Sequence, residues 1–132
     1  LFCILITLTL YIVLGMTKIY KFQDDISTDA LKELEKHSSL AIDTEGSGLQ
    51  IPHRDKLSLV QFSTGNNDAY IIQPNRKNYK ASNIVKILEN TKVTKIGHYL
   101  RYDVSGLEYF LKCNVKNIQD QKHHILNNGQ FL

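Results

Sequence analysis

The chain has 132 residues, of which 42% are hydrophobic, and a formal net charge of +3. This length fits one domain and leaves no room for a second, and the mild charge permits a phosphate-bearing partner without the strong basicity of many nucleic-acid-binding modules. Its two cysteines, Cys3 and Cys113, show no C-x-x-C spacing, which argues against a zinc site or a disulfide framework and favours a reduced, cytoplasmic setting.

Residues 1–15 form an uncharged, almost wholly apolar run. The run is shorter than the roughly 20 residues that cross a bilayer, and Lys18 and Lys21 follow it, whereas a signal peptide carries its positive charge first. Met16 stands where the run ends. We interpret the run as upstream sequence ahead of a misplaced start, with a membrane-associating anchor or a genuine extra helix or strand as alternatives, and place the domain at residues 16–132.

The first elements of this domain are a short edge strand and a helix. Residues 18–22 favour the strand, and Ser27 is a good N-cap for a helix that runs to about His37. Ile26 before the cap and Leu31 at the fourth helical position are the apolar pair that clamps a helix entry.

The next stretch places two carboxylates at the end of an apolar strand. Residues 40–42 predict a short buried strand, and because strand side chains alternate, Asp43 and Glu45 lie on one face with Thr44 on the other. At about 3.3 Å per residue, their Cα atoms lie roughly 6 to 7 Å apart. Two carboxylates held this close repel each other unless one protonates or a divalent cation such as Mg²⁺ compensates them.

The surroundings of this pair favour a site at a strand end. Gly46, Ser47, Gly48 and Pro52 predict a turn, and the chain resumes as a strand over residues 57–62. The alternative is that Asp43 and Glu45 are solvated residues that only form the turn.

Four further elements follow in chain order. Residues 68–73 predict a strand, Ser82 a cap for a helix that ends at Asn90, residues 93–97 a strand, and residues 99–112 a helix. The first of these helices presents one apolar side, made of Ile84, Val85, Ile87 and Leu88.

Asp103 lies in line with the apolar stripe of its own helix. Leu107, Phe110 and Leu111 follow it at four, seven and eight positions. An unpaired charge in that place costs several kcal/mol or is neutralised by protonation, so Asp103 is a candidate functional carboxylate.

A structural role for Asp103 is the alternative, because it could cap the following turn or pair with Arg101 or Arg54. His98 and Arg101 are either surface residues at a strand-to-helix junction or contacts for a phosphate backbone.

Three stretches follow one another in the sequence: D-T-E in an apolar strand, then P-H-R-D-K-L-S-L-V-Q-F, then K-I-G-H-Y-L-R-Y-D-V. Together they resemble the motifs of the ribonuclease D-like DEDD 3′–5′ exonucleases, in particular the short NrnC-type oligoribonucleases of alphaproteobacteria. The resemblance implies an α/β fold, a ribonuclease H-like mixed sheet flanked by helices, incomplete at the C-terminus. It also implies that Asp43, Glu45 and Asp103 hold two Mg²⁺ or Mn²⁺ ions and hydrolyse the terminal phosphodiesters of short single-stranded RNA. The residues that it places against nucleic acid are Thr44, Leu49, His53, Arg54, His98 and Arg101.

The chain departs from this family because no third motif, Y-x-x-x-D, follows Asp103. In the family that motif supplies a water-orienting tyrosine and a fourth metal ligand. Tyr109 is followed by Cys113 at the required offset, and adjacent His123 and His124 face different directions if helical. We therefore expect an impaired exonuclease, or one completed by a second fragment or a homo-oligomer. The alternative is an inactive remnant that binds metal or nucleic acid only.

Two glycines are smaller departures. Gly46 replaces a threonine common after D-T-E, and Gly97 stands where relatives often carry phenylalanine. Backbone freedom from glycine at the very end of the ligand-bearing strand is expected to loosen the site by up to about 1 kcal/mol.

Overall fold

A computed structural model describes residues 18–48 and 55–121 of the chain. The interpretation of residues 1–15 lies outside these residues, as do the predictions for Leu49, His53, Arg54, His123 and His124.

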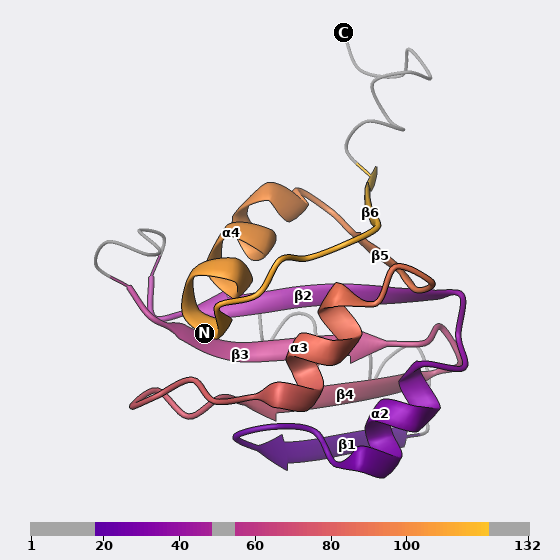
Figure 1. Ribbon diagram of the computed structural model, residues 1–132, viewed down its shortest axis with the longest axis horizontal. Helices are drawn as coiled ribbons and strands as arrows, with labels where there is room; N and C mark the ends of the chain where they lie inside the picture. The colour runs from indigo at the N-terminus through magenta and orange to yellow at the C-terminus, as the bar shows by residue number, and fades with distance from the viewer. Residues whose placement is uncertain (1–17, 49–54, 122–132) are drawn as a thin grey trace, which may run out of the picture.

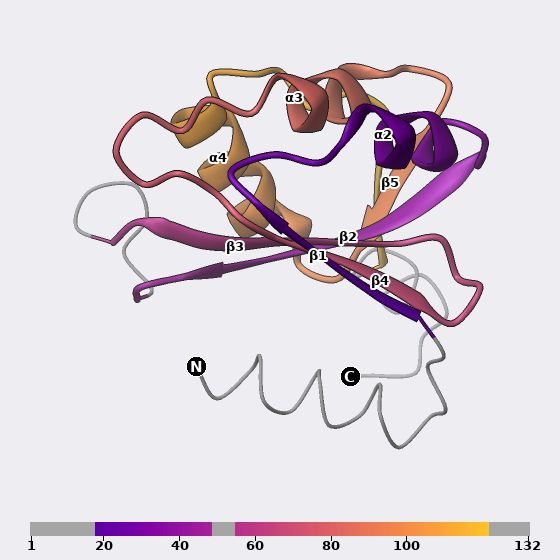
Figure 2. The same cartoon turned by 90° about the horizontal axis from the view of Figure 1, so that it is seen from below.

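Six strands form one sheet, and three helices cover one face of it (Figures 1 and 2). In chain order the elements are β1 (Lys18–Gln23), α2 (Thr28–Leu34), β2 (Ser39–Gly46), β3 (Leu57–Ser63), β4 (Asp68–Gln73), α3 (Ser82–Glu89), β5 (Thr94–Gly97), α4 (Leu100–Leu111) and β6 (Ile118–Asp120).

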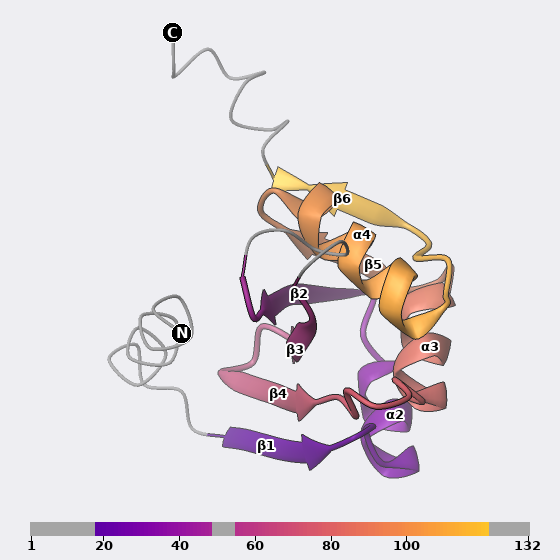
Figure 3. The same ribbon diagram turned by 90° about the vertical axis from the view of Figure 1, so that its left-hand side faces the viewer.

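The strands lie in the order β1-β4-β3-β2-β5-β6, which Figure 3 shows from the side. β3 is antiparallel to β2 and β4, whereas the pairs β1–β4, β2–β5 and β5–β6 are parallel. This confirms the mixed α/β sheet flanked by helices, and it puts β2 near the centre with neighbours on both sides. Within the described residues, no helix is long and apolar enough to cross a membrane.

The entry to α2 is as predicted. Ser27 Oγ accepts a hydrogen bond from the amide of Ala30 at 3.1 Å, and both Ile26 and Leu31 are buried. The helix ends at Leu34, earlier than expected, because the amides of Lys36 and His37 bond three residues back and tighten the last turn.

The cap of α3 corrects the sequence analysis. Ser82 is the first helical residue, and Ala81 precedes it without a side-chain cap. The carboxylate of Asp25 takes this role instead, accepting hydrogen bonds from the amides of Asn83 at 2.8 Å and Ile84 at 3.0 Å. A cap supplied from 58 residues away gives no local sequence signal.

Candidate active site

β2 carries Asp43 and Glu45 at its end, with the alternation that its sequence predicts. Ile42 and Thr44 are buried, whereas Asp43 and Glu45 are half-buried. The strand register shifts between Glu45 and Gly46, an irregularity of the kind that re-aims side chains beside functional sites. The two carboxylates thus belong to one face of β2, next to a local break in its pairing.

Asp103 reaches the same strand from α4. Its Oδ1 accepts hydrogen bonds from the Thr44 amide at 2.9 Å and from the Thr44 hydroxyl at 2.5 Å. Both residues are buried, and 59 positions separate them in sequence. Asp103 is therefore bonded to the sheet rather than to a neighbour on its own helix, and the hydroxyl of Thr44, which the resemblance placed against nucleic acid, is used for this bond.

Burial raises the pKa of all three carboxylates, and neighbouring charges add to this at Glu45 and Asp103. Burial raises the pKa of Asp43 and of Glu45, and the charges of Asp43 and Asp103 raise that of Glu45 further. Burial raises the pKa of Asp103 to about 6, the charge of Asp43 adds to this, and the hydrogen bonds from Thr44 oppose it. Glu33 forms ion pairs with Lys36 and His37, and neither of these pairs involves the three carboxylates.

Such a donor set suits a hard divalent cation. Carboxylate oxygens are the ligands that Mg²⁺ prefers, and a cation removes the mutual repulsion that otherwise favours protonation. Among the described residues, no three His, Cys, Asp or Glu side chains are already arranged to hold a metal. Since Asp103 lies on the Thr44 side of β2, the assignment of Asp43, Glu45 and Asp103 as metal ligands stays a prediction.

Sequence reasoning missed two residues beside this cluster. The hydroxyl of Tyr102 donates to the carbonyl of Gly48 at 2.9 Å, and its pKa is raised first by burial and then by the charges of Asp55, Asp103 and Glu45. Asp55 is buried, and a Cβ on Gly48 would lie 2.4 Å from its Oδ2. Tyr102 follows no periodic pattern, and adjacency to Asp103 was its only sequence signal.

The N-terminus of α4 is fixed from β6. Asp120 Oδ1 accepts a hydrogen bond from the amide of Tyr99 at 3.1 Å, and Tyr99 has the left-handed backbone at φ 54°. His98 and Arg101 beside it are exposed, so their predicted role as phosphate contacts is sterically open and stays a prediction.

Gly97 has a role that the sequence did not indicate. A Cβ built on it would lie 2.3 Å from Leu100 Cδ2 and 2.9 Å from the carbonyl oxygen of Ile42. The absence of a side chain therefore lets β5 and the start of α4 approach β2 closely.

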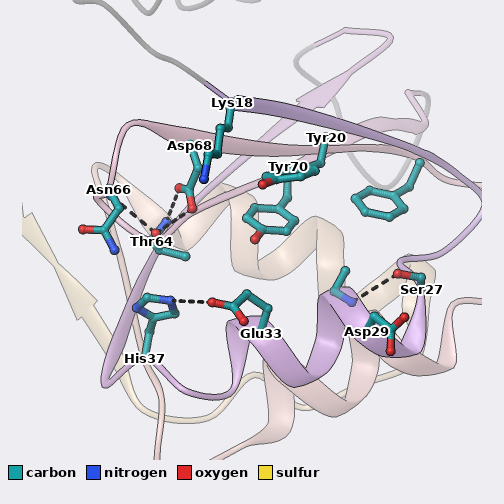
Figure 4. A pocket seen from close by; sticks show the side chains of 12 residues that line it. Lys18, Tyr20, Ser27, Asp29, Glu33, His37, Thr64, Asn66, Asp68 and Tyr70 are labelled. Atoms are coloured by element: carbon teal, nitrogen blue, oxygen red, sulfur yellow. Dashed lines mark hydrogen bonds and ion pairs between the residues drawn. The ribbon is translucent and has the colours of Figure 1, made fainter.

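Two cavities differ in how they relate to this cluster. A small one, of about 50 Å³, is partly lined by Asp43 and Gln61. A larger one, of about 610 Å³, lies between α2 and the edge of the sheet (Figure 4). Its charged lining consists of Lys18, Asp29, Glu33, Asp68 and His37, so carboxylates predominate, and it offers little attraction to a phosphate.

Comparison with known proteins identifies the family. The family model described as 3′–5′ exonuclease matches residues 20–128. NrnC of Brucella melitensis is 31% identical with a TM-score of 0.80, covering 88% of this chain and 55% of that one. NrnC structures with bound Mg²⁺ and bound to pGG are 30% and 32% identical, with TM-scores of 0.79 and 0.76 over 88% and 83% of this chain and 56% and 52% of those chains.

Ribonuclease D of Escherichia coli, 20% identical with a TM-score of 0.61 over 78% of this chain and 27% of its own, shares the fold. Among curated protein sequences, none matches significantly. The chain spans about half the length of the NrnC structures. The predicted ribonuclease H-like fold is thus confirmed, and the chain belongs to the 3′–5′ exonuclease family.

Proposed function

We propose that the chain is the metal-binding part of a 3′–5′ exoribonuclease that acts on short single-stranded RNA. The observation that carries this proposal is the group of Asp43, Glu45 and Asp103 in an exonuclease-family fold: burial raises the pKa of all three, and the charge of Asp43 raises the pKa of both Glu45 and Asp103 further. NrnC with Mg²⁺ and NrnC with pGG support a divalent cation and a short RNA as the ligands.

In this proposal the carboxylates of Asp43 and Glu45 bind Mg²⁺ or Mn²⁺ from the strand, and that of Asp103 binds from the helix. Cations held there would supply an activated water and charge neutralisation at the phosphate oxygens. Thr44 holds Asp103 in place through two hydrogen bonds. His98 and Arg101, exposed at the start of α4, contact the phosphate backbone.

No Y-x-x-x-D follows Asp103 in this sequence, so the tyrosine that aims the water and one metal ligand are missing from the chain at the place where the family has them. Water-positioning groups are typically worth about 10²- to 10⁴-fold in rate. We therefore expect slow cleavage by the chain alone, and faster cleavage when a second fragment or a second copy supplies the missing groups.

Release of mononucleotides from a 5′-labelled short RNA tests this function. The chain is expected to cleave slowly with Mn²⁺, and Asp43→Ala or EDTA should abolish cleavage. Equal cleavage by Asp43→Ala would contradict the assignment, and fast Asp43-dependent cleavage by the chain alone would contradict the impairment.

The alternative function is binding of metal or nucleic acid without hydrolysis. Calorimetric titration with Mn²⁺ separates the two. Mn²⁺ binding that Asp43→Ala removes, without any cleavage under the same conditions, would favour a binding remnant.

A further inference from the structure

A groove of about 660 Å³ lies between the loop before α3, α3 itself and the last turn of α4, segments that lie side by side in Figures 1 and 2. We call it the α3–α4 groove. It shares no residue with the carboxylate cluster. Its lining residues are Asp25, Asn78, Tyr79, Lys80, Ala81, Ser82, Val85, Lys86, Phe110, Leu111 and Lys112.

The groove is basic. Lys80, Lys86 and Lys112 line it and are exposed, and none of them forms an ion pair within the described residues. Arg76, exposed in the same loop, lies close enough to Tyr79 to influence its pKa. The carboxylate of Asp25, the one acidic residue of this lining, already accepts hydrogen bonds from the amides at the start of α3. The positive charge of the groove is therefore left for a ligand.

Aromatic rings adjoin these lysines. The rings of Tyr79 and Phe110 lie 4.6 Å apart, and that of Tyr109 lies 5.0 Å from Phe110. Tyr109 is 49% exposed, and Lys112 Nζ lies 4.5 Å from its ring centre. Tyr109 lies beside the lining residues Phe110 and Lys112 and is the exposed ring of the three, whereas Tyr79 and Phe110 are half-buried. An exposed ring next to cations suits single-stranded nucleic acid, because a base can stack on the ring while phosphates contact the cations.

Two connections relate the groove to the carboxylate cluster. Asp103 and Phe110 are seven positions apart on α4, which is about 10 Å along a helix axis. The Tyr79 hydroxyl donates to the carbonyl of Leu57 at 2.9 Å, and Leu57 pairs with Gly46, the residue after Glu45. An oligonucleotide of a few residues is long enough to extend from the carboxylate cluster to the groove.

We propose that the α3–α4 groove is a second binding surface for single-stranded RNA, with phosphates on Lys80, Lys86 and Lys112 and a base on Tyr109. The choice of RNA as the ligand rests on the proposed function, whereas the charge and the rings of the groove do not depend on it. This surface adds affinity for oligonucleotides longer than those that the carboxylate cluster can contact.

Fluorescence anisotropy with a labelled ten-nucleotide single-stranded RNA tests the proposal on the full chain, in EDTA so that no cleavage occurs. The triple variant Lys80→Gln/Lys86→Gln/Lys112→Gln should bind roughly tenfold or more weakly, and the slope of log K against log salt should fall by about 2. Tyr109→Ala should weaken binding with little change in that slope. The matched control is Lys32→Gln/Lys92→Gln/Lys116→Gln, which changes the net charge equally at exposed lysines outside the groove and should weaken binding less than about twofold.

Equal weakening by the two triple variants would overturn the proposal, because only net charge would then matter. So would failure of the unaltered chain to bind RNA, including the case where it binds vesicles of anionic lipid instead. The outcome can be distinguished from that of the proposed function. Lysine-dependent binding without any nuclease activity would support the groove proposal and not the proposed function. Asp43-dependent cleavage, together with unaltered RNA binding by the groove variant, would contradict the groove proposal and leave the proposed function standing.

Discussion

Lys95 and Asp103 are both buried charged residues, one on β5 and one on α4, and their surroundings differ. Lys95 is 0% exposed, and its Nζ donates to the carbonyls of Asn90 and Val93 at 2.7 Å and of Ile87 at 3.5 Å. Asp103 is 6% exposed and accepts two hydrogen bonds from Thr44, but burial, and then the charge of Asp43, raise its pKa.

The difference separates a structural charge from a functional one. Three carbonyl oxygens near the end of α3 satisfy the ammonium group of Lys95, so this charge joins β5 to the helix layer. The carboxylate of Asp103 accepts hydrogen bonds, but no described positive charge is paired with it. A bound cation would stabilise its charged form. Four predictions test this contrast, from the largest expected effect to the smallest.

Lys95→Ala should lower the free energy of unfolding by about 3 to 5 kcal/mol, because it removes a buried aliphatic chain and leaves carbonyl groups without a donor. Urea unfolding at pH 7 measures this. Lys95→Met keeps the volume and should lose less. Equal stability of Lys95→Ala and the unaltered chain would show that the ammonium group is not structural.

The two groups should give opposite pH dependences in the metal-free chain. In the folded chain the pKa of Asp103 is about 6, above its ordinary 3.8. Its contribution to the free energy of unfolding is therefore present at low pH and is lost as pH rises from about 4 to about 6. Burial lowers the pKa of Lys95 from 10.5 to about 8, so stability increases as pH rises from about 8 to about 10.5. The change amounts to at most about 3 kcal/mol for Asp103 and at most about 3.5 kcal/mol for Lys95.

Urea unfolding in EDTA across this pH range measures both windows. Asp103→Asn should abolish the change in stability between about pH 4 and 6, and Lys95→Met the change between about pH 8 and 10.5. Each effect is measured as the difference in unfolding free energy between the variant and the unaltered chain. The contrast fails if either variant keeps the pH dependence of the unaltered chain in its own window.

Asp103→Asn should raise the stability of the metal-free chain at pH 8 by about 1 to 2 kcal/mol, because the amide keeps an oxygen for Thr44 without a buried charge. Mn²⁺ should stabilise the unaltered chain and leave this variant unchanged. Thermal melts with and without Mn²⁺ measure both effects. A variant that is less stable than the unaltered chain in EDTA would show that the Asp103 charge supports the fold.

Thr44→Val should cost about 1 kcal/mol, because it removes the hydroxyl donor to Asp103 and keeps the amide donor. Since the Thr44 hydrogen bonds lower the pKa of Asp103, this variant should raise that pKa further. An NMR titration of the Asp103 side-chain carbon measures the shift, with Thr64→Val as a control hydroxyl that bonds Asp68 instead. An unchanged pKa would contradict the role given to Thr44.

The strands and helices, and part of the site, follow from the sequence. Side-chain alternation along β2 places Asp43 and Glu45 on one face, and the confirmed cap at Ser27 is a local signal three residues long. The motifs that carry the family resemblance are also local, because they lie on β2, β3 and the β5–α4 junction.

Contacts between distant segments could not be predicted in this way. The Thr44–Asp103 bond, the cap of α3 by Asp25 and the carbonyls around Lys95 each join different elements. No periodicity distinguishes Lys95 from an exposed strand lysine, since its side chain is buried against the end of α3 and the loop that follows it.

The sequence by itself therefore determined the elements, the two carboxylates of β2 and the family, because these depend on neighbours within a few residues. The tertiary structure alone decided which charges are compensated, where Gly97 must lack a side chain, and that lysines from the loop before α3, α3 and α4 gather in one groove. Those outcomes depend on strand order and helix packing, which bring together residues far apart in the chain.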